Sequence, residues 1–143
     1  MAALLDVNVL IALLDSDHSL HGRAAAWFEK HGRLGWASCP ITQNGCVRIM
    51  SSQAYPSPLS VQSIAERLAE AAASPHHSFW PDDISLLDSR IVDTSRIHTP
   101  RQLTDLYLLA LAVRRGGSLA TFDDHISIEA VKGAAPRHLA RLY

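Results

Sequence analysis

The chain has 143 residues, of which 48% are apolar and 19% charged, and its formal net charge is −1. This composition excludes a disordered chain, and a net charge near zero gives no electrostatic sign of nucleic-acid binding. The length predicts a single domain spanning residues 1–143, with a substantial hydrophobic core.

Predicted strands and helices alternate along the chain. The apolar run over residues 2–11 is interpreted as a buried strand, and residues 9–14 as a short buried helix. Further helices are expected over residues 20–31, 42–50, 61–72 and 88–92, and from a cap at Thr99 or Thr104 to 113; further strands are expected over 34–39, 79–80, 118–122 and 138–143. This alternation predicts an α/β fold with a mainly parallel sheet.

Three features bear on the compartment. Cys39 and Cys46 are the only cysteines, which is too few for a disulfide scaffold and favours reduced thiols in the cytoplasm. The apolar N-terminus lacks a basic start and is interrupted by Asp6 and Asn8, so we do not expect a signal peptide. No apolar run is long enough to cross a membrane.

Three aspartates stand out by their positions. Asp6 lies in an apolar run with no Lys or Arg before Arg23, where an unpaired carboxylate is costly to bury. Asp6 and Asp123 follow predicted strands, whose carboxyl ends share one edge of a parallel sheet. Asp105 precedes the aliphatic helix 106–113, where interaction with the helix dipole alone is a sufficient explanation. Together, three converging carboxylates repel each other, and Mg²⁺ or Mn²⁺ would relieve that repulsion.

Three segments carry a family resemblance. The segments LLDVNVL at 4–10, QLTDLYLLALA at 102–112 and LATFD at 119–123 resemble the PIN domain, most closely the VapC-type toxins of bacterial toxin–antitoxin pairs. The segment ITQNGCVR at 41–48 and the histidines at 18 and 21 resemble one VapC subgroup. The resemblance covers nearly the whole chain, in order.

The resemblance implies a three-layer α/β/α sandwich and a magnesium-dependent endoribonuclease. It also implies a homodimer that is inhibited by a small antitoxin protein. Asp6 and Asp105 would bind the metal, Asp123 would complete the acidic site, and Asn8 and Thr121 would orient it by hydrogen bonds.

One position departs from the family pattern. The chain has Gln43 where the family commonly has Glu, and an amide brings no charge to a metal site. This keeps open an alternative, a PIN-like module that binds RNA or an antitoxin without cutting. Asp124 is a candidate to restore the charge, although a single acidic loop residue is more often solvated. A structure-specific DNA nuclease ranks lower, because the chain lacks room for the helices that thread DNA.

Other residues are assigned no definite role. His18 and His21 are spaced for zinc on one helix face, but no third ligand lies nearby. Six arginines are candidates for contacts with RNA or a partner, and the sequence does not rank them: Arg48, Arg90, Arg96, Arg101, Arg114 and Arg115.

Overall fold

Five short strands form one sheet in which every neighbouring pair is parallel. In this computed structural model, which describes residues 1–143, the strands are β1 (Ala3–Leu5), β2 (Trp36–Ser38), β3 (His77–Phe79), β4 (Ser118–Thr121) and β5 (Leu139–Arg141). The α-helices are α1 (Val7–Leu14), α2 (His21–His31), α3 (Pro40–Met50), α4 (Val61–Ala72) and α5 (Leu103–Arg114). The predicted α/β fold with a parallel sheet is confirmed.

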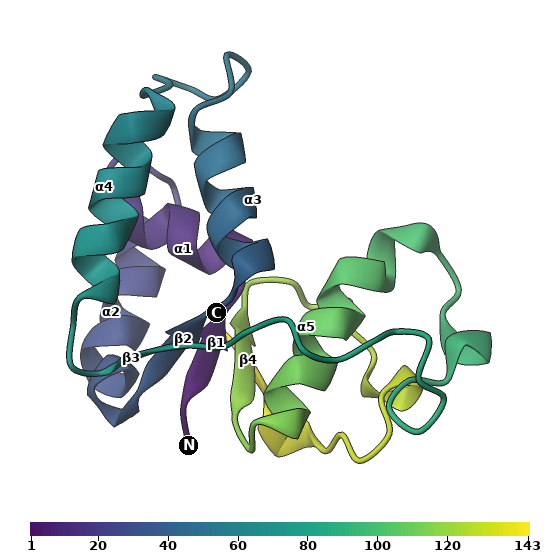
Figure 1. Cartoon of the computed structure of the whole chain (residues 1–143). Helices are drawn as coiled ribbons and strands as arrows, with labels where there is room; N and C mark the ends of the chain where they lie inside the picture. Colours follow the sequence, from purple (N-terminus) through teal and green to yellow (C-terminus); the bar gives the residue numbers. More distant parts are fainter.

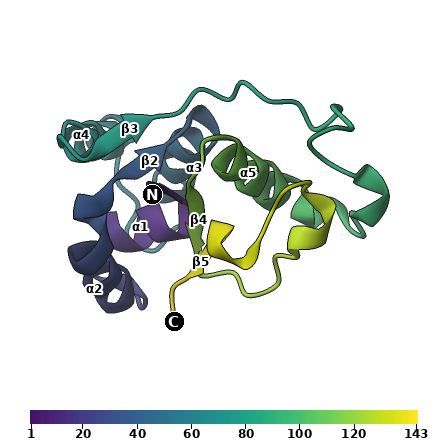
Figure 2. The same cartoon turned by 90° about the horizontal axis from the view of Figure 1, so that it is seen from below.

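The helices form a layer on each face of the sheet. Helices α1 to α4 gather on one side and α5 lies on the other, as Figure 1 and the view from below in Figure 2 show. The alternating side chains of β1 explain this arrangement: Leu4 belongs to the core cluster with α5, whereas Ala3 and Leu5 belong to the cluster with α1, α3 and α4. Both faces of the strand are therefore apolar, as expected for a parallel sheet covered on both sides.

The strand order places a topological switch at the centre of the sheet. The order is β3-β2-β1-β4-β5, so the chain builds outward from β1 in one direction and then returns to add β4 and β5 on the other side. Leu5 pairs with Ala120, which brings the carboxyl ends of β1 and β4 side by side. Open α/β sheets bind ligands at such a crevice.

The first predicted strand is wrong beyond Leu5. The backbone leaves the sheet at Asp6, and the helix α1 begins at Val7. The Asp6 carboxylate accepts a hydrogen bond from the Val7 N–H at 2.7 Å and so caps the helix. Residues 9–12 are all buried, so their hydrophobicity has no period that distinguishes a strand from a helix.

Two other predictions at element ends are confirmed. Ser60 caps α4, with its Oγ accepting from the Ser63 N–H at 3.1 Å. The final edge strand is β5, which pairs with β4.

In the segment that precedes α5, one predicted helix is absent, and one of the two predicted helix caps is confirmed. No helix forms over 88–92, because the Asp88 carboxylate binds the backbone N–H and guanidinium of Arg90 and closes a turn instead. Thr99 Oγ1 accepts from the Arg101 N–H at 3.0 Å and caps a 3₁₀ turn over Pro100–Gln102 that leads into α5. The alternative cap at Thr104 is wrong, since this residue lies inside α5.

None of these helices combines the length and hydrophobicity that are needed to span a bilayer.

Candidate active site

Asp6 is fixed at the carboxyl end of β1 and is only 6% exposed. Its Oδ1 accepts from the Val7 N–H, and its Oδ2 accepts from the Thr121 hydroxyl at 2.7 Å. Burial raises the pKa of this carboxyl and the charge of Asp123 adds to the effect, against the two hydrogen bonds, which favour the charged form. The protein therefore holds a buried carboxylate in one orientation without an ionic partner.

Asp105 meets Asp6 and Asp123 from the first turn of α5. Burial, the negative charges of Asp6 and Asp123, and a hydrogen bond with Asp123 together raise the pKa of Asp105 to about 7. No Lys or Arg forms an ion pair with any of the three carboxylates. The structure thus brings the three predicted acidic residues within electrostatic reach of one another.

Thr121 and Asn8 connect the first strand to the Asp123 turn. The Thr121 hydroxyl donates to Asp6 and accepts from the Asp123 N–H at 3.0 Å. Asn8 Oδ1 accepts from the Phe122 N–H over a longer 3.4 Å. Both side chains therefore hold the turn after β4 against the start of α1.

Gln43 and Asp124 are placed apart from this arrangement. Gln43 Nε2 donates to Ser38 Oγ at 2.9 Å, and the same Ser38 oxygen bonds His77 Nε2 at 2.8 Å. The exposed Asp124 lies 3.3 Å from His125 Nε2. Neither side chain joins the hydrogen bonds of the three carboxylates. Sequence reasoning missed the Gln43–Ser38–His77 chain because its members lie on three separate elements.

A pocket of about 290 Å³ opens beside two of the acids. Asp105 and Asp123 line it together with Arg101, His125 and Ser127. His125 carried no signal in the sequence: it has no neighbouring metal-ligand pattern and enters the site only because the chain turns after β4. Its N–H donates to Asp123 Oδ1 at 2.8 Å, which fixes the position of that carboxylate.

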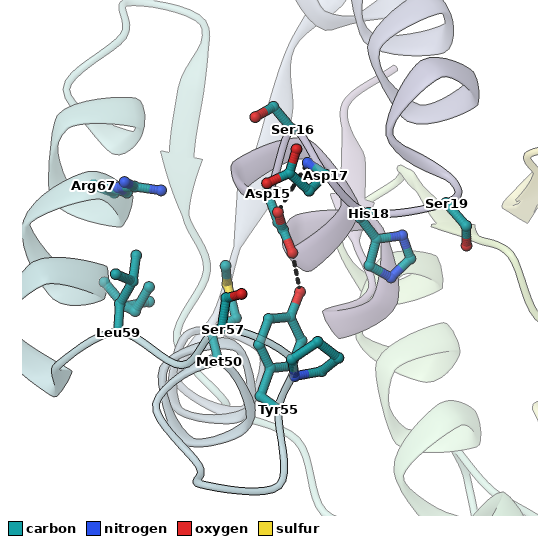
Figure 3. A pocket seen from close by; sticks show the side chains of 12 residues that line it. Asp15, Ser16, Asp17, His18, Ser19, Met50, Tyr55, Ser57, Leu59 and Arg67 are labelled. Carbon is teal, nitrogen blue, oxygen red and sulfur yellow. Dashed lines mark hydrogen bonds between the residues drawn. The ribbon is translucent and has the colours of Figure 1, made fainter.

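A second, separate pocket of about 530 Å³ lies at the other end of α1 (Figure 3). Asp15, His18, Tyr55 and Arg67 line it, and the Tyr55 hydroxyl donates to Asp15. His18 Nδ1 accepts from the Leu20 N–H, and His21 Nδ1 is bonded to the Ala12 carbonyl, so these rings serve local structure. None of the predicted acidic residues reaches this pocket.

The chemistry of the carboxylates fits a hard divalent cation. Oxygen ligands and uncompensated negative charge suit Mg²⁺ or Mn²⁺ rather than zinc. No group of three or more His, Cys, Asp or Glu side chains is arranged to ligate one ion directly. Mg²⁺ commonly keeps several waters and needs only one or two carboxylates, so the set at Asp6, Asp105 and Asp123 remains compatible with it.

Comparison with known proteins identifies the family to which this chain belongs. The sequence model of the PIN domain family matches residues 3–132, which is most of the chain. The chain belongs to the PIN domain family and is a VapC-type member of it, as its similarity to individual proteins shows.

Several relatives in Mycobacterium tuberculosis are similar over almost their whole length. The chain is 54% identical to Ribonuclease VapC44 of strain H37Rv over 142 residues, covering 99% of this chain and 100% of the relative. It is 42% identical to Ribonuclease VapC39 over 134 residues, covering 93% and 96%. A solved structure of VapBC2 from Rickettsia felis, bound to a DNA fragment from its promoter, contains a chain that matches this fold with a TM-score of 0.56 and 11% identity, covering 86% of this chain and 89% of that one.

Proposed function

We propose that this protein is a magnesium-dependent endoribonuclease that acts as the toxin of a toxin–antitoxin pair. The observation that carries the proposal is the uncompensated set of carboxylates at the switch between β1 and β4, where the pKa of Asp105 rises to about 7. The relatives named ribonucleases, at up to 54% identity in the comparisons above, support RNA as the substrate.

Asp6, Asp105 and Asp123 would hold the cation, one or two of them directly and the rest through its bound waters. A bound Mg²⁺ supplies a polarised water as nucleophile and stabilises the negative charge that develops on the phosphate. The chain contributes rigidity: Val7 and Thr121 each occupy one oxygen of Asp6, and His125 occupies one oxygen of Asp123, so neither carboxylate rotates freely. Such fixed groups need little rearrangement at the moment of reaction.

A direct test is cleavage of total bacterial RNA by the purified protein. We expect cleavage with Mg²⁺, none with EDTA, and recovery when Mg²⁺ is added in excess. Asp105→Asn, which removes one charge with little change of shape, is expected to slow cleavage at least about 100-fold. Full activity in EDTA, or an Asp105→Asn variant as fast as wild type, contradicts the proposal.

The partners of the protein are also proposals. VapC-type membership favours a small antitoxin partner and a homodimer in the cytoplasm, where the RNA substrate lies. The Rickettsia felis structure is described as a VapBC2 assembly on promoter DNA, which is consistent with a toxin bound to its antitoxin. Light scattering of the purified protein, alone and with the product of the adjacent gene, tests the homodimer and the antitoxin partner. A protein that is monomeric and does not bind this product contradicts both proposals.

Gln43 favours a second candidate function, a module that binds RNA or antitoxin without cutting. Its amide is engaged with Ser38 and brings no negative charge to the acidic set. Mg²⁺ titration by calorimetry alongside the cleavage assay separates the two functions. Measurable metal-dependent turnover eliminates the binding-only function, whereas RNA binding without turnover supports it.

A further inference from the structure

One arginine lines the pocket beside the acidic residues. Arg101 is the only Lys or Arg that lines it, and it shares the pocket with Asp105 and Asp123. The guanidinium nevertheless forms no ion pair or hydrogen bond with either carboxylate or with any other group of the protein. A free cation at a site dominated by negative charge is available for an anion that comes from outside.

The backbone of Arg101 is held firmly while its side chain is exposed. Pro100 begins the 3₁₀ turn, and the Thr99 hydroxyl accepts from the Arg101 N–H at 3.0 Å. The neighbouring arginine Arg96 differs, because its guanidinium lies 3.3 Å from the Asp93 carboxylate and outside the pocket. A capped turn thus places Arg101 at the pocket, and no other group of the protein pairs with its guanidinium.

An acidic site that acts on RNA has an electrostatic difficulty. The three carboxylates repel the phosphate backbone, and a metal ion compensates charge only where it is bound. A guanidinium pairs with two phosphate oxygens through parallel N–H donors, which fixes the direction of the phosphate as well as its position. We propose that Arg101 is a positioning residue that binds a backbone phosphate of the RNA substrate in this pocket; the assignment rests on the proposed ribonuclease function.

His125 is a poorer candidate for this role. It lines the same pocket, but its imidazole lies 3.3 Å from the exposed Asp124 carboxylate. An imidazole also lacks the forked set of donors that matches a phosphate.

The test measures RNA binding and cleavage separately. Binding is followed by fluorescence anisotropy with a labelled single-stranded RNA of randomised sequence, in the Asp6→Asn background to prevent turnover. We expect Arg101→Ala to weaken binding about 10- to 100-fold, as loss of a charged hydrogen-bonding pair does, and Arg101→Lys to recover part of it. The slope of log affinity against log salt concentration is negative, and in Arg101→Ala it should become shallower by about 0.7 for one lost phosphate contact on a single strand. Arg96→Ala is the matched control and should leave both quantities near the wild-type values.

Cleavage and metal binding complete the test. Arg101→Ala in the otherwise wild-type protein should raise KM more than it lowers kcat, and its Mg²⁺ affinity by calorimetry should be unchanged. An Arg101→Ala variant with wild-type affinity and salt slope overturns this assignment alone. Wild-type protein that neither binds nor cuts RNA overturns the proposed function and the assignment with it.

Discussion

Helix α1 carries an aspartate at each end, and the two carboxyl groups respond to the fold in opposite ways. Burial raises the pKa of Asp6 at the amino end, whereas the Tyr55 hydroxyl, which donates to Asp15, lowers the pKa of Asp15 at the carboxyl end. The helix dipole alone would favour the opposite order, since it stabilises negative charge at the amino end. The surroundings therefore outweigh the dipole at both ends.

The difference separates a structural carboxylate from a functional one. The charge of Asp15 is satisfied by donors of the protein, including the Asp17 N–H and the Tyr55 hydroxyl (Figure 3). The charge of Asp6 is opposed by burial and by Asp123, and no basic side chain pairs with it. A carboxylate that the protein itself leaves uncompensated is the one that needs a cation from solution.

The largest expected effect comes from replacing Asp6 by Asn, with the same replacement of Asp15 as the comparison. Asp6→Asn removes a proposed metal ligand and should lower kcat/KM for RNA cleavage by about 10²- to 10³-fold. Asp15→Asn is the matched control on the same helix and should stay within about twofold of wild type, since it touches only the second pocket. Equal losses in both variants would contradict the separation of the two ends.

Packing offers a way to disturb the amino end alone. A Cβ on Gly45 in α3 would lie 2.8 Å from Cγ2 of Val7, the residue that follows Asp6. Gly45→Ala should cost about 1–3 kcal/mol of the free energy of unfolding, measured in urea, and reduce cleavage because Asp6 shifts. Gly22→Ala in α2 is the control: a Cβ there meets nothing within 4 Å, so helix propensity should stabilise the protein by about 0.5–1 kcal/mol.

The repulsion among the acids should appear in the pH dependence of stability without divalent ions. The pKa of Asp105 is about 7 in the folded protein, above the ordinary 3.8 of the unfolded chain, so its contribution is present below about pH 4 and is lost as the pH rises through 7. Asp105→Asn should therefore be more stable than wild type at pH 8, by about 1–2 kcal/mol after solvent screening of this partly buried group.

The same variant should lose its advantage at pH 4, where the wild-type carboxyl is neutral. Excess Mg²⁺ at pH 8 should reverse the order, because the wild type, with all three carboxylates, gains more from binding than the variant. Urea unfolding at both pH values measures these differences, and an advantage that is independent of pH would contradict the repulsion.

The smallest effect belongs to the carboxyl end of α1. Tyr55→Phe removes the hydrogen bond to Asp15 and should cost about 0.5–1 kcal/mol at pH 7, with cleavage unchanged. The pKa of Asp15 is lowered, so its contribution is present above the unfolded pKa, near pH 4, and is lost as the pH falls through the folded value. The cost should therefore vanish in strong acid, where Asp15 is protonated in both proteins.

The sequence predicted the fold well where hydrophobic spacing and caps agreed. Ser60 and the apolar spacing of the following residues define α4, and the alternation of elements defines the parallel sheet. It failed at Asp6, because α1 is apolar except for Asn8 and buries four consecutive residues, 9–12, so it has no continuous polar face to reveal its period. It failed again at 88–92, where the local bond between Asp88 and Arg90 closes a turn.

The candidate site was only partly accessible from the sequence. Asp6 and Asp123 could be placed together because both follow neighbouring parallel strands. The free guanidinium of Arg101 could not be distinguished from five other arginines, since ion pairing depends on side-chain placement that no local pattern encodes. The destination of Gln43 was equally hidden, because its partner Ser38 lies on another element.

The most direct test is an NMR titration of the Asp105 carboxyl carbon in protein labelled at aspartate, with and without Mg²⁺. Uncompensated repulsion predicts a pKa near 7 without the metal and a marked fall when Mg²⁺ saturates the site. Asp15 serves as the internal reference, with a pKa below its usual range that Mg²⁺ does not move. An Asp105 pKa near 4 that does not change when Mg²⁺ is added would contradict a metal site at this edge of the sheet.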